Sequence, residues 1–403
     1  MRPSTATGQR DRAVIAMMLA ASVASTIGGL PFNSLPVMLG SLADSFALDS
    51  KAVGLIGSIC FAGYLVGTLG APLWINRLDW RWLTVISAAG SAASFALSAS
   101  VRELGALYVM WALIGFFAST MTCLGMRILS DLPNKVRAFG VRQGVELSLT
   151  AAVLFALPPL VIATWKYPGA AWALAAVVAA LGLSALWLPR HPIVALPASS
   201  AASTTAPMQR RSRIPARAWF VLGVFFVFLA GNIALWAFLE RIGASLQITP
   251  AQMGLVFAVL KLLGGGAAFF CAWIGDRAGQ RLPYWVVLAA IAAGLALIAQ
   301  SASFASFALG VWLWEFAFTC GCVFQSALIA RSDASGRAVV LIPAVFALGS
   351  MVGPAAAGYL VAAGSFGPLL LLALATSVVP VLAHALRPTP VGAAAGAARA
   401  AQR

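Results

Sequence analysis

The chain has 403 residues, of which 61% are hydrophobic and only 9% are charged, and its formal net charge is +15. Its mean hydropathy of +0.94 lies far above the range of soluble globular chains and indicates a polytopic membrane protein. A nucleic-acid partner is not expected, because such binding needs basic residues clustered on a soluble domain.

The apolar runs are long enough to predict helices rather than the strands of a barrel. About 20 apolar residues span the bilayer as a helix, whereas barrel strands alternate over about 10 residues. In chain order the sequence predicts twelve transmembrane helices, at Ala13–Leu39, Val53–Ile75, Leu83–Ala99, Leu104–Met126, Gly140–Thr164, Ala170–Leu188, Ala218–Leu239, Met253–Ile274, Pro283–Ala299, Phe304–Ile329, Val339–Val361 and Phe366–Leu386.

The positive charges predict which way the helices cross. With the N-terminus inside, 21 of the 26 Lys and Arg residues fall in segments that face the cytoplasm. Lys51, Arg102, Lys166 and Arg241 would face outward, and Lys261 would lie within the membrane. Because short cytoplasmic loops concentrate Lys and Arg, we expect both termini inside, in a bacterial-type cytoplasmic (inner) membrane.

A change in composition near the middle divides the chain. Residues 189–216 are rich in Pro, Ser, Thr, Ala and Arg, which predicts a flexible cytoplasmic linker. The expected organisation is a six-helix bundle at 1–188, this linker, a second six-helix bundle at 217–387 and a disordered tail at 388–403.

The residue types that enzymes and metal sites need are sparse. All five cysteines lie in predicted helices, and the histidines, His191 and His384, are far apart in sequence. No Walker loop is present, so ATP-driven transport is not expected. The sequence therefore predicts neither an enzyme nor a cofactor or metal site.

A family resemblance is carried by the loop after the eighth predicted helix, which reads Asp276-Arg277-Ala278-Gly279-Gln280-Arg281. Together with twelve helices in two sixes and a basic central linker, this loop resembles that of the major facilitator superfamily. The resemblance implies an all-α integral membrane fold of two pseudo-symmetric six-helix bundles. It also implies a secondary active transporter that works by alternating access.

The loop after the second predicted helix is a weaker copy of the same pattern. Asn76 stands where the family has Asp and Asp79 where it has a second Gly, so only Arg77 and Arg81 carry over. The resemblance implies that Asp276, Arg277, Gly279, Arg281, Arg77 and Arg81 form a conformational latch, in which the charges meet helix ends and carboxylates. The alternative is that both loops only supply topogenic positive charge.

Polar residues within the membrane are costly and mark a transport pathway. In the family, helices 1, 4, 7 and 10 line the central cavity. On the tenth predicted helix Glu315, Thr319, Cys322 and Ser326 form one polar stripe, with Gln325 beside it. The seventh offers Asn232, Trp236 and Glu240, and the fourth only Ser119 and Thr122.

The first predicted helix contains Gly28, Gly29, Pro31 and Pro36, so some of its carbonyls lack helical partners. Asn33 would lie where these groups converge and bind substrate, or it would cap a freed carbonyl within a kink. The expected substrate-binding residues are thus Lys261, Asn33, Asn232, Trp236, Gln325 and Thr319.

Lys261 is the most informative single residue, because it lies mid-membrane on a face of small residues. It would bind an anionic substrate or form a permanent ion pair with Glu315. Both are compatible if the substrate displaces Glu315, which then takes up a proton, since burial disfavours a charged carboxyl. Glu146 is a second candidate for proton coupling, although Arg142 lies four residues before it and could neutralise it.

Taken together, these features predict a proton-coupled carrier of a small organic solute, with an organic anion and uptake by symport favoured. The alternative is a proton-coupled efflux antiporter for drugs or metabolites. The expected partners are the substrate, protons and the lipid bilayer, and the chain is expected to be monomeric.

Overall fold

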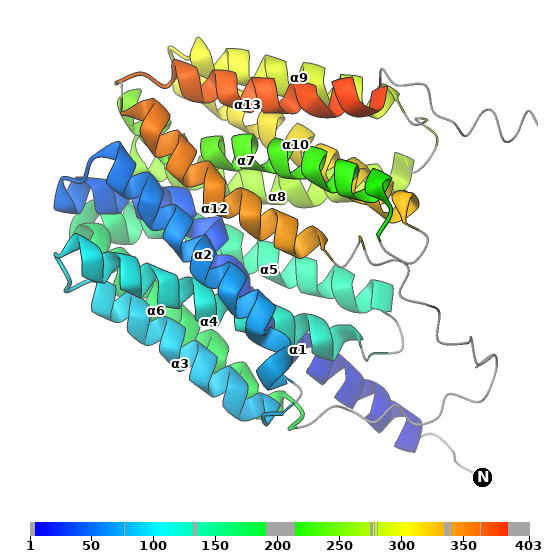
Figure 1. Ribbon diagram of the computed structural model, residues 1–403. Coiled ribbons are helices and arrows are strands. Elements are labelled where there is room, and N and C mark those ends of the chain that lie inside the picture. The colour runs from blue at the N-terminus through cyan, green and yellow to red at the C-terminus, as the bar shows by residue number, and fades with distance from the viewer. Residues whose placement is uncertain are drawn as a thin grey trace, which may run out of the picture.

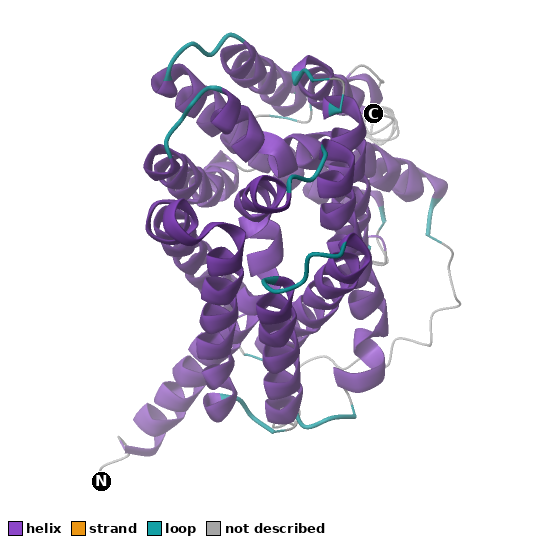
Figure 2. Cartoon of the chain, turned by 90° about the vertical axis from the view of Figure 1, so that its left-hand side faces the viewer, coloured by secondary structure: helices purple, strands orange, loops and turns teal. Residues whose placement is uncertain are grey.

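The computed structural model of the chain describes residues 5–75, 77–130, 132, 135–190, 214–274, 277, 279, 281–333, 338, 341–362 and 364–385. Across these ranges the regular structure is helical, and the helices run side by side with the N-terminus at one end of the bundle (Figure 1). Figure 2 faces the opposite end, where loops join successive helices. The fold is therefore all-α, as predicted. Most of the predicted linker and the whole predicted tail lie outside the described residues.

The long helices follow the apolar runs of the sequence. Their bounds are α1 (Thr5–Phe46), α2 (Ser50–Ile75), α3 (Trp80–Ser98), α4 (Leu104–Ser130), α5 (Lys135–Leu157), α6 (Ala163–Gly182), α7 (Ala216–Ser245), α8 (Pro250–Ile274), α9 (Leu282–Ala299), α10 (Phe304–Ser332), α12 (Ile342–Val361) and α13 (Gly367–Pro380). Short turns extend three of them, namely η1 (Pro158–Ile162), η2 (Leu183–Trp187) and η4 (Val381–Ala385).

Ten helical segments of the described chain are long and apolar enough to cross a membrane. One of them, Gly140–Trp187, has 48 residues and would be far longer than the bilayer if straight. It turns back at Lys166, whose φ of 53° and ψ of −148° break the helix, so it supplies two crossings, α5 and α6. With the less apolar α3, this arrangement is consistent with the twelve predicted crossings.

Several helix boundaries differ from the predicted ones for local reasons. α1 begins at Thr5, eight residues before the predicted start at Ala13, so the helix includes the polar segment that precedes the apolar run. α3 begins at Trp80, where the Asp79 side chain accepts hydrogen bonds from the backbone N–H groups of Arg81 and Trp82. α12 begins at Ile342, with a proline in its first turn, a position that suits proline.

The helices contact one another in two groups. α1 to α6 contact one another, as do α7 to α13, and the most extensive contacts between the groups join α2 with α12, α5 with α8, and α1 with α7. These three helix pairs surround the space between the groups, where the candidate site lies. We call the end with the α1–α2 and α7–α8 loops the predicted outer end, and the other the predicted cytoplasmic end.

Candidate functional site

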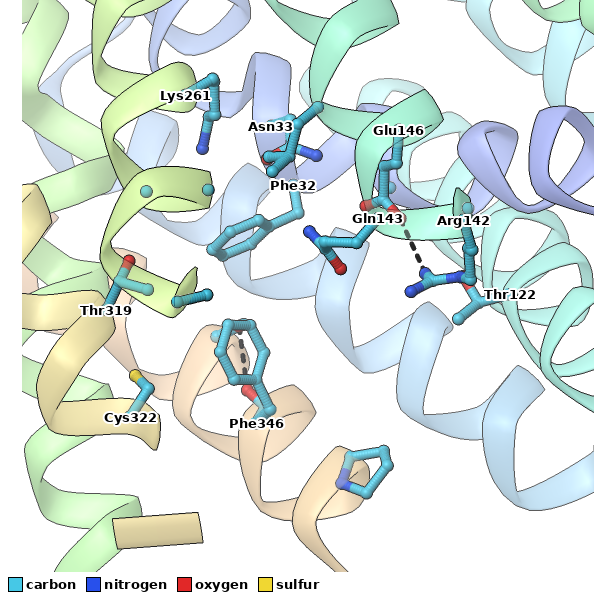
Figure 3. A pocket seen from close by; sticks show the side chains of 18 of the residues that line it. Phe32, Asn33, Thr122, Arg142, Gln143, Glu146, Lys261, Thr319, Cys322 and Phe346 are labelled. Atoms are coloured by element: carbon cyan, nitrogen blue, oxygen red, sulfur yellow. Dashed lines mark hydrogen bonds and ion pairs between the residues drawn. The ribbon is translucent and has the colours of Figure 1, made fainter. Parts of the chain in front are cut away.

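A cavity of about 530 Å³ lies between the two groups of helices (Figure 3). Seven helices contribute to its wall: α1, α2, α4, α5, α8, α10 and α12. Its charged lining residues among those described are Arg142, Glu146, Lys261 and Glu315. Its volume is in the range of pockets that hold small organic molecules.

The cavity opens towards the predicted cytoplasmic end. Lining residues near that end, Gln143 and Pro343, are exposed. By contrast, Asn33, Lys261 and Glu315, which lie deeper, are only 5–8% exposed. A solute therefore has access from the predicted cytoplasmic side and meets the deep residues last.

Contacts between the two groups close the predicted outer end. Arg241 on α7 forms an ion pair with Asp44 on α1 and also donates to the carbonyl of Gly40 at 3.3 Å. Nearby, the Ser58 hydroxyl of α2 accepts a hydrogen bond of 2.8 Å from the backbone N–H of Ala355 on α12. These bonds must break if the predicted outer end is to open.

On one wall of the cavity α5 presents an ion pair. Arg142 Nη2 lies 2.7 Å from Glu146 Oε2, and the Arg142 Nε–H donates to the Ser25 hydroxyl at 2.7 Å. Glu146 is also hydrogen-bonded by the side chain of Asn33. The local neutralisation predicted for Arg142 and Glu146 is thus present, and it ties α5 to α1.

On the opposite wall stands Lys261, with its side chain 5% exposed (Figure 3). Its ammonium Nζ lies 4.0 Å from the centre of the Trp236 ring and 5.6 Å from that of Phe32. Among the described residues no carboxylate oxygen lies within 4.0 Å of it, although Glu315 and Glu146 interact with it electrostatically. The ion pair between Lys261 and Glu315 is therefore not formed in this state, and the ammonium rests on aromatic faces.

Glu315 lines the same wall on α10. It is hydrogen-bonded to the side chain of Thr319, and Cys322 follows one turn further along the cavity. Gly264 on α8 faces this carboxyl, since a Cβ added there would lie 2.8 Å from Glu315 Oε1. The predicted polar stripe of this helix therefore faces the cavity over Glu315, Thr319 and Cys322.

Three of the predicted substrate-binding residues do not line the cavity. Asn232 is fully buried, donating to Phe228 O and Ser377 and accepting from Trp314 Nε1 at 2.9 Å. Gln325 is 1% exposed and lies outside the cavity wall. Trp236 lies behind the cavity wall and contacts two residues that line it, Lys261 and Phe32.

The predicted latch residues are only partly described. Asp276 lies outside the described residues. Gly279 has a φ of +69°, which a glycine adopts without strain. Arg81 donates from Nε to Leu188 O at 2.6 Å, and Arg277 to Trp273 O at 3.4 Å, so both arginines meet the ends of helical segments in their own group. Arg77 is exposed, and the N–H of Tyr284 donates to the carbonyl of Arg281 at 3.2 Å.

Sequence reasoning missed two aromatic residues of the cavity. Phe32 and Phe346 lie between the two charged walls, with their ring centres 5.3 Å apart (Figure 3). The Tyr64 hydroxyl, which donates to Thr122 at 3.0 Å, completes the polar lining of α2 and α4. With 23 phenylalanines in the chain, no periodic signal separates these two from packing residues.

Comparisons with known proteins identify the family. The family profile described as Major Facilitator Superfamily matches residues 16–332. A search of curated protein sequences finds no significant match.

Solved structures of transporters share the fold. The nucleoside transporter NupG matches with a TM-score of 0.72 and 15% identity over 91% of this chain and 98% of that one. A D-xylose-proton symporter matches with a TM-score of 0.72 and 14% identity, over 92% and 96%. The human organic anion transporter MFSD10 matches with a TM-score of 0.60 and 18% identity, over 92% and 98%.

At 14–18% identity, the solved structures show only that the fold is shared. The family is assigned from the profile match. The profile covers more than half of the chain, and the membrane-spanning helices and central cavity agree with it. The chain therefore belongs to the Major Facilitator Superfamily and is a multi-pass membrane protein that acts as a secondary transporter rather than as an enzyme.

Proposed function

We propose that this transporter carries a small organic anion together with protons, with uptake as the favoured direction. One observation carries the proposal: a buried ammonium, that of Lys261, faces the cavity with no carboxylate within 4.0 Å among the described residues. Contact with aromatic faces offsets only part of the cost of burying a cation. An anionic substrate would supply the missing countercharge.

Glu315 is the proposed proton carrier. It interacts electrostatically with Lys261 and lines the same wall of the cavity. An anion bound to Lys261 would cancel the charge that favours ionised Glu315, so this carboxyl would bind a proton as the anion arrives. Because binding linkage is reciprocal, protonation of Glu315 would strengthen anion binding by the same factor. Glu146, which forms an ion pair with Arg142 on the opposite wall, is the second candidate.

The lining of the cavity supports a substrate that carries a ring. Phe32 lies 5.8 Å from Phe61 and 5.3 Å from Phe346, centre to centre, and all three face the cavity. A carboxylate at Lys261 would place the body of the substrate against these rings. We therefore propose an aromatic monocarboxylate over a small aliphatic one.

The test is transport in proteoliposomes, with 4-hydroxybenzoate, lactate and succinate as probes and protein-free liposomes as the control for passive permeation. An acidic exterior should drive accumulation of the preferred acid above that control, and Lys261→Gln should abolish it. Glu315→Gln should leave anion exchange intact but remove the dependence on the pH gradient. Efflux driven by proton entry would support the antiporter instead. A flux insensitive to both the gradient and Lys261 would overturn the proposal.

A further inference from the structure

The carbonyl of Phe32 lacks a helical partner because of a proline. In an α-helix this carbonyl would accept from the N–H four residues later, but that residue is Pro36, which has no N–H. A backbone carbonyl left unpaired inside a membrane protein is costly. The indole Nε1–H of Trp236 donates to it at 3.0 Å, so a side chain of α7 replaces the bond that α1 lost.

The same indole ring supports Lys261. The ammonium lies 4.0 Å from the ring centre, while Phe257 packs edge-on against the ring at 5.6 Å. Trp236 is 3% exposed, so these contacts exclude water from it. One side chain therefore contacts α1 through its N–H edge and α8 through its face.

The two contacts of Trp236 differ in the helix groups that they join. The bond to Phe32 crosses between the two helix groups, whereas the contact with Lys261 stays within the second group. Further along α1 and α7, Arg241 binds Asp44 and the carbonyl of Gly40. The Trp236–Phe32 bond is thus the innermost described hydrogen bond between α1 and α7, and it adjoins the substrate cavity.

A cation over the indole face draws electron density from the ring and makes its N–H a better donor, because neighbouring polar interactions reinforce one another at low dielectric. The ammonium therefore strengthens the bond that holds α1 to α7. We infer that Trp236 is a positioning residue through which the charge at Lys261 stabilises the closed state of the predicted outer end. Removal or neutralisation of that charge loosens the closure.

The experiment measures opening directly and needs no substrate. Spin labels are placed at Ala47→Cys, directly after α1, and at Ala244→Cys on α7, both exposed at the predicted outer end. In a background without the native cysteines they report the distance between the outer ends of these two helices. Trp236→Phe keeps an aromatic face but loses the N–H donor. Lys261→Gln keeps a side chain of similar length but loses the charge.

Each single variant should raise the ratio of open to closed populations about five-fold or more, the lower range of conformational couplings. The double variant should add little to Trp236→Phe, because both changes act on one bond. The matched control is Trp312→Phe, which removes an indole bond of equal length, 3.0 Å to Val256 O, within the second group. It should leave the distance distribution unchanged, with thermal unfolding confirming that every variant is folded.

Additive effects of Trp236→Phe and Lys261→Gln would overturn the inference, as would an unchanged distribution in either single variant. The outcome is separate from that of the proposed function, which fails if no organic acid depends on Lys261 for transport. In that case the coupling between the Lys261 ammonium and closure of the predicted outer end would still hold, without an anionic substrate.

Discussion

Arg142 and Glu146 form an ion pair across one turn of α5, with Nη2 2.7 Å from Oε2, and both face the cavity. The pair neutralises its own wall, so the charged groups left to meet a substrate and a proton are Lys261 and Glu315 on the opposite wall. This asymmetry underlies the account of selectivity. It also predicts what happens when one partner of the pair is removed.

Glu146→Gln should destabilise the protein by about 1–3 kcal/mol, because it leaves the partly buried Arg142 guanidinium without its carboxylate. The double variant Arg142→Met with Glu146→Met should regain most of that loss, since an ion pair replaced by apolar groups is often neutral. Thermal unfolding in detergent measures both. A double variant as unstable as Glu146→Gln would show that the pair does not act as a unit.

Asn232 should prove structural. Its side chain is committed to Phe228 O, Ser377 and Trp314, away from the cavity. Asn232→Ala should therefore lower stability by about 1–3 kcal/mol, through the groups left unpaired, while the affinity for a transported acid stays unchanged. A large loss of affinity in a variant of normal stability would contradict this assignment.

The contrast between Asn232 and Lys261 shows how far the sequence predicts the site. A polar residue in an apolar helix signals a special position, and both residues were identified in that way. Helical spacing does not reveal whether the polar face meets a cavity or a neighbouring helix. Glu315 and Thr319 face the cavity, whereas Asn232, at an equally polar position, meets α10 and α13.

The fold was more predictable than the site because the thickness of the bilayer sets the length of each crossing. The roles of single residues near the helix ends and kinks were harder to interpret, because bilayer thickness does not determine them. Asp79 looks like a departure from the family's loop pattern, yet it caps the first turn of α3. The sequence predicts that the prolines of α1 free backbone carbonyls. The group that binds the Phe32 carbonyl, the indole of Trp236, is 204 residues away in sequence, and only tertiary packing brings it there.

The predicted outer end should open more readily when its ion pair is removed. Asp44→Asn deprives Arg241 of a carboxylate, although the Gly40 carbonyl remains. Because the pair is partly exposed, the effect should be at most about 1 kcal/mol, a two- to five-fold rise in the open population. The spin-label distance between positions 47 and 244 measures it. A shift toward the closed population would contradict the assigned gate.

Close backbone packing of α2 against α12 should be essential for closure at the same end. A Cβ added to Gly358 would collide with the carbonyl of Ser50 and lie 3.2 Å from Gly54 Cα. Gly358→Val should destabilise the closed state by about 1–3 kcal/mol, so the ratio of closed to open populations falls roughly 5- to 150-fold. Gly266→Val is the matched control, because nothing lies within 4 Å of a Cβ there. Equal effects of the two substitutions would refute the argument.

The central claim, that Lys261 binds the anionic substrate, is tested most directly by calorimetric titration of the purified protein with 4-hydroxybenzoate, lactate and succinate. The account predicts saturable binding of at least one of these acids, strongest for 4-hydroxybenzoate, and its loss in Lys261→Gln at unchanged thermal stability of the unliganded protein. An acid that binds Lys261→Gln as tightly as the natural chain would contradict the claim.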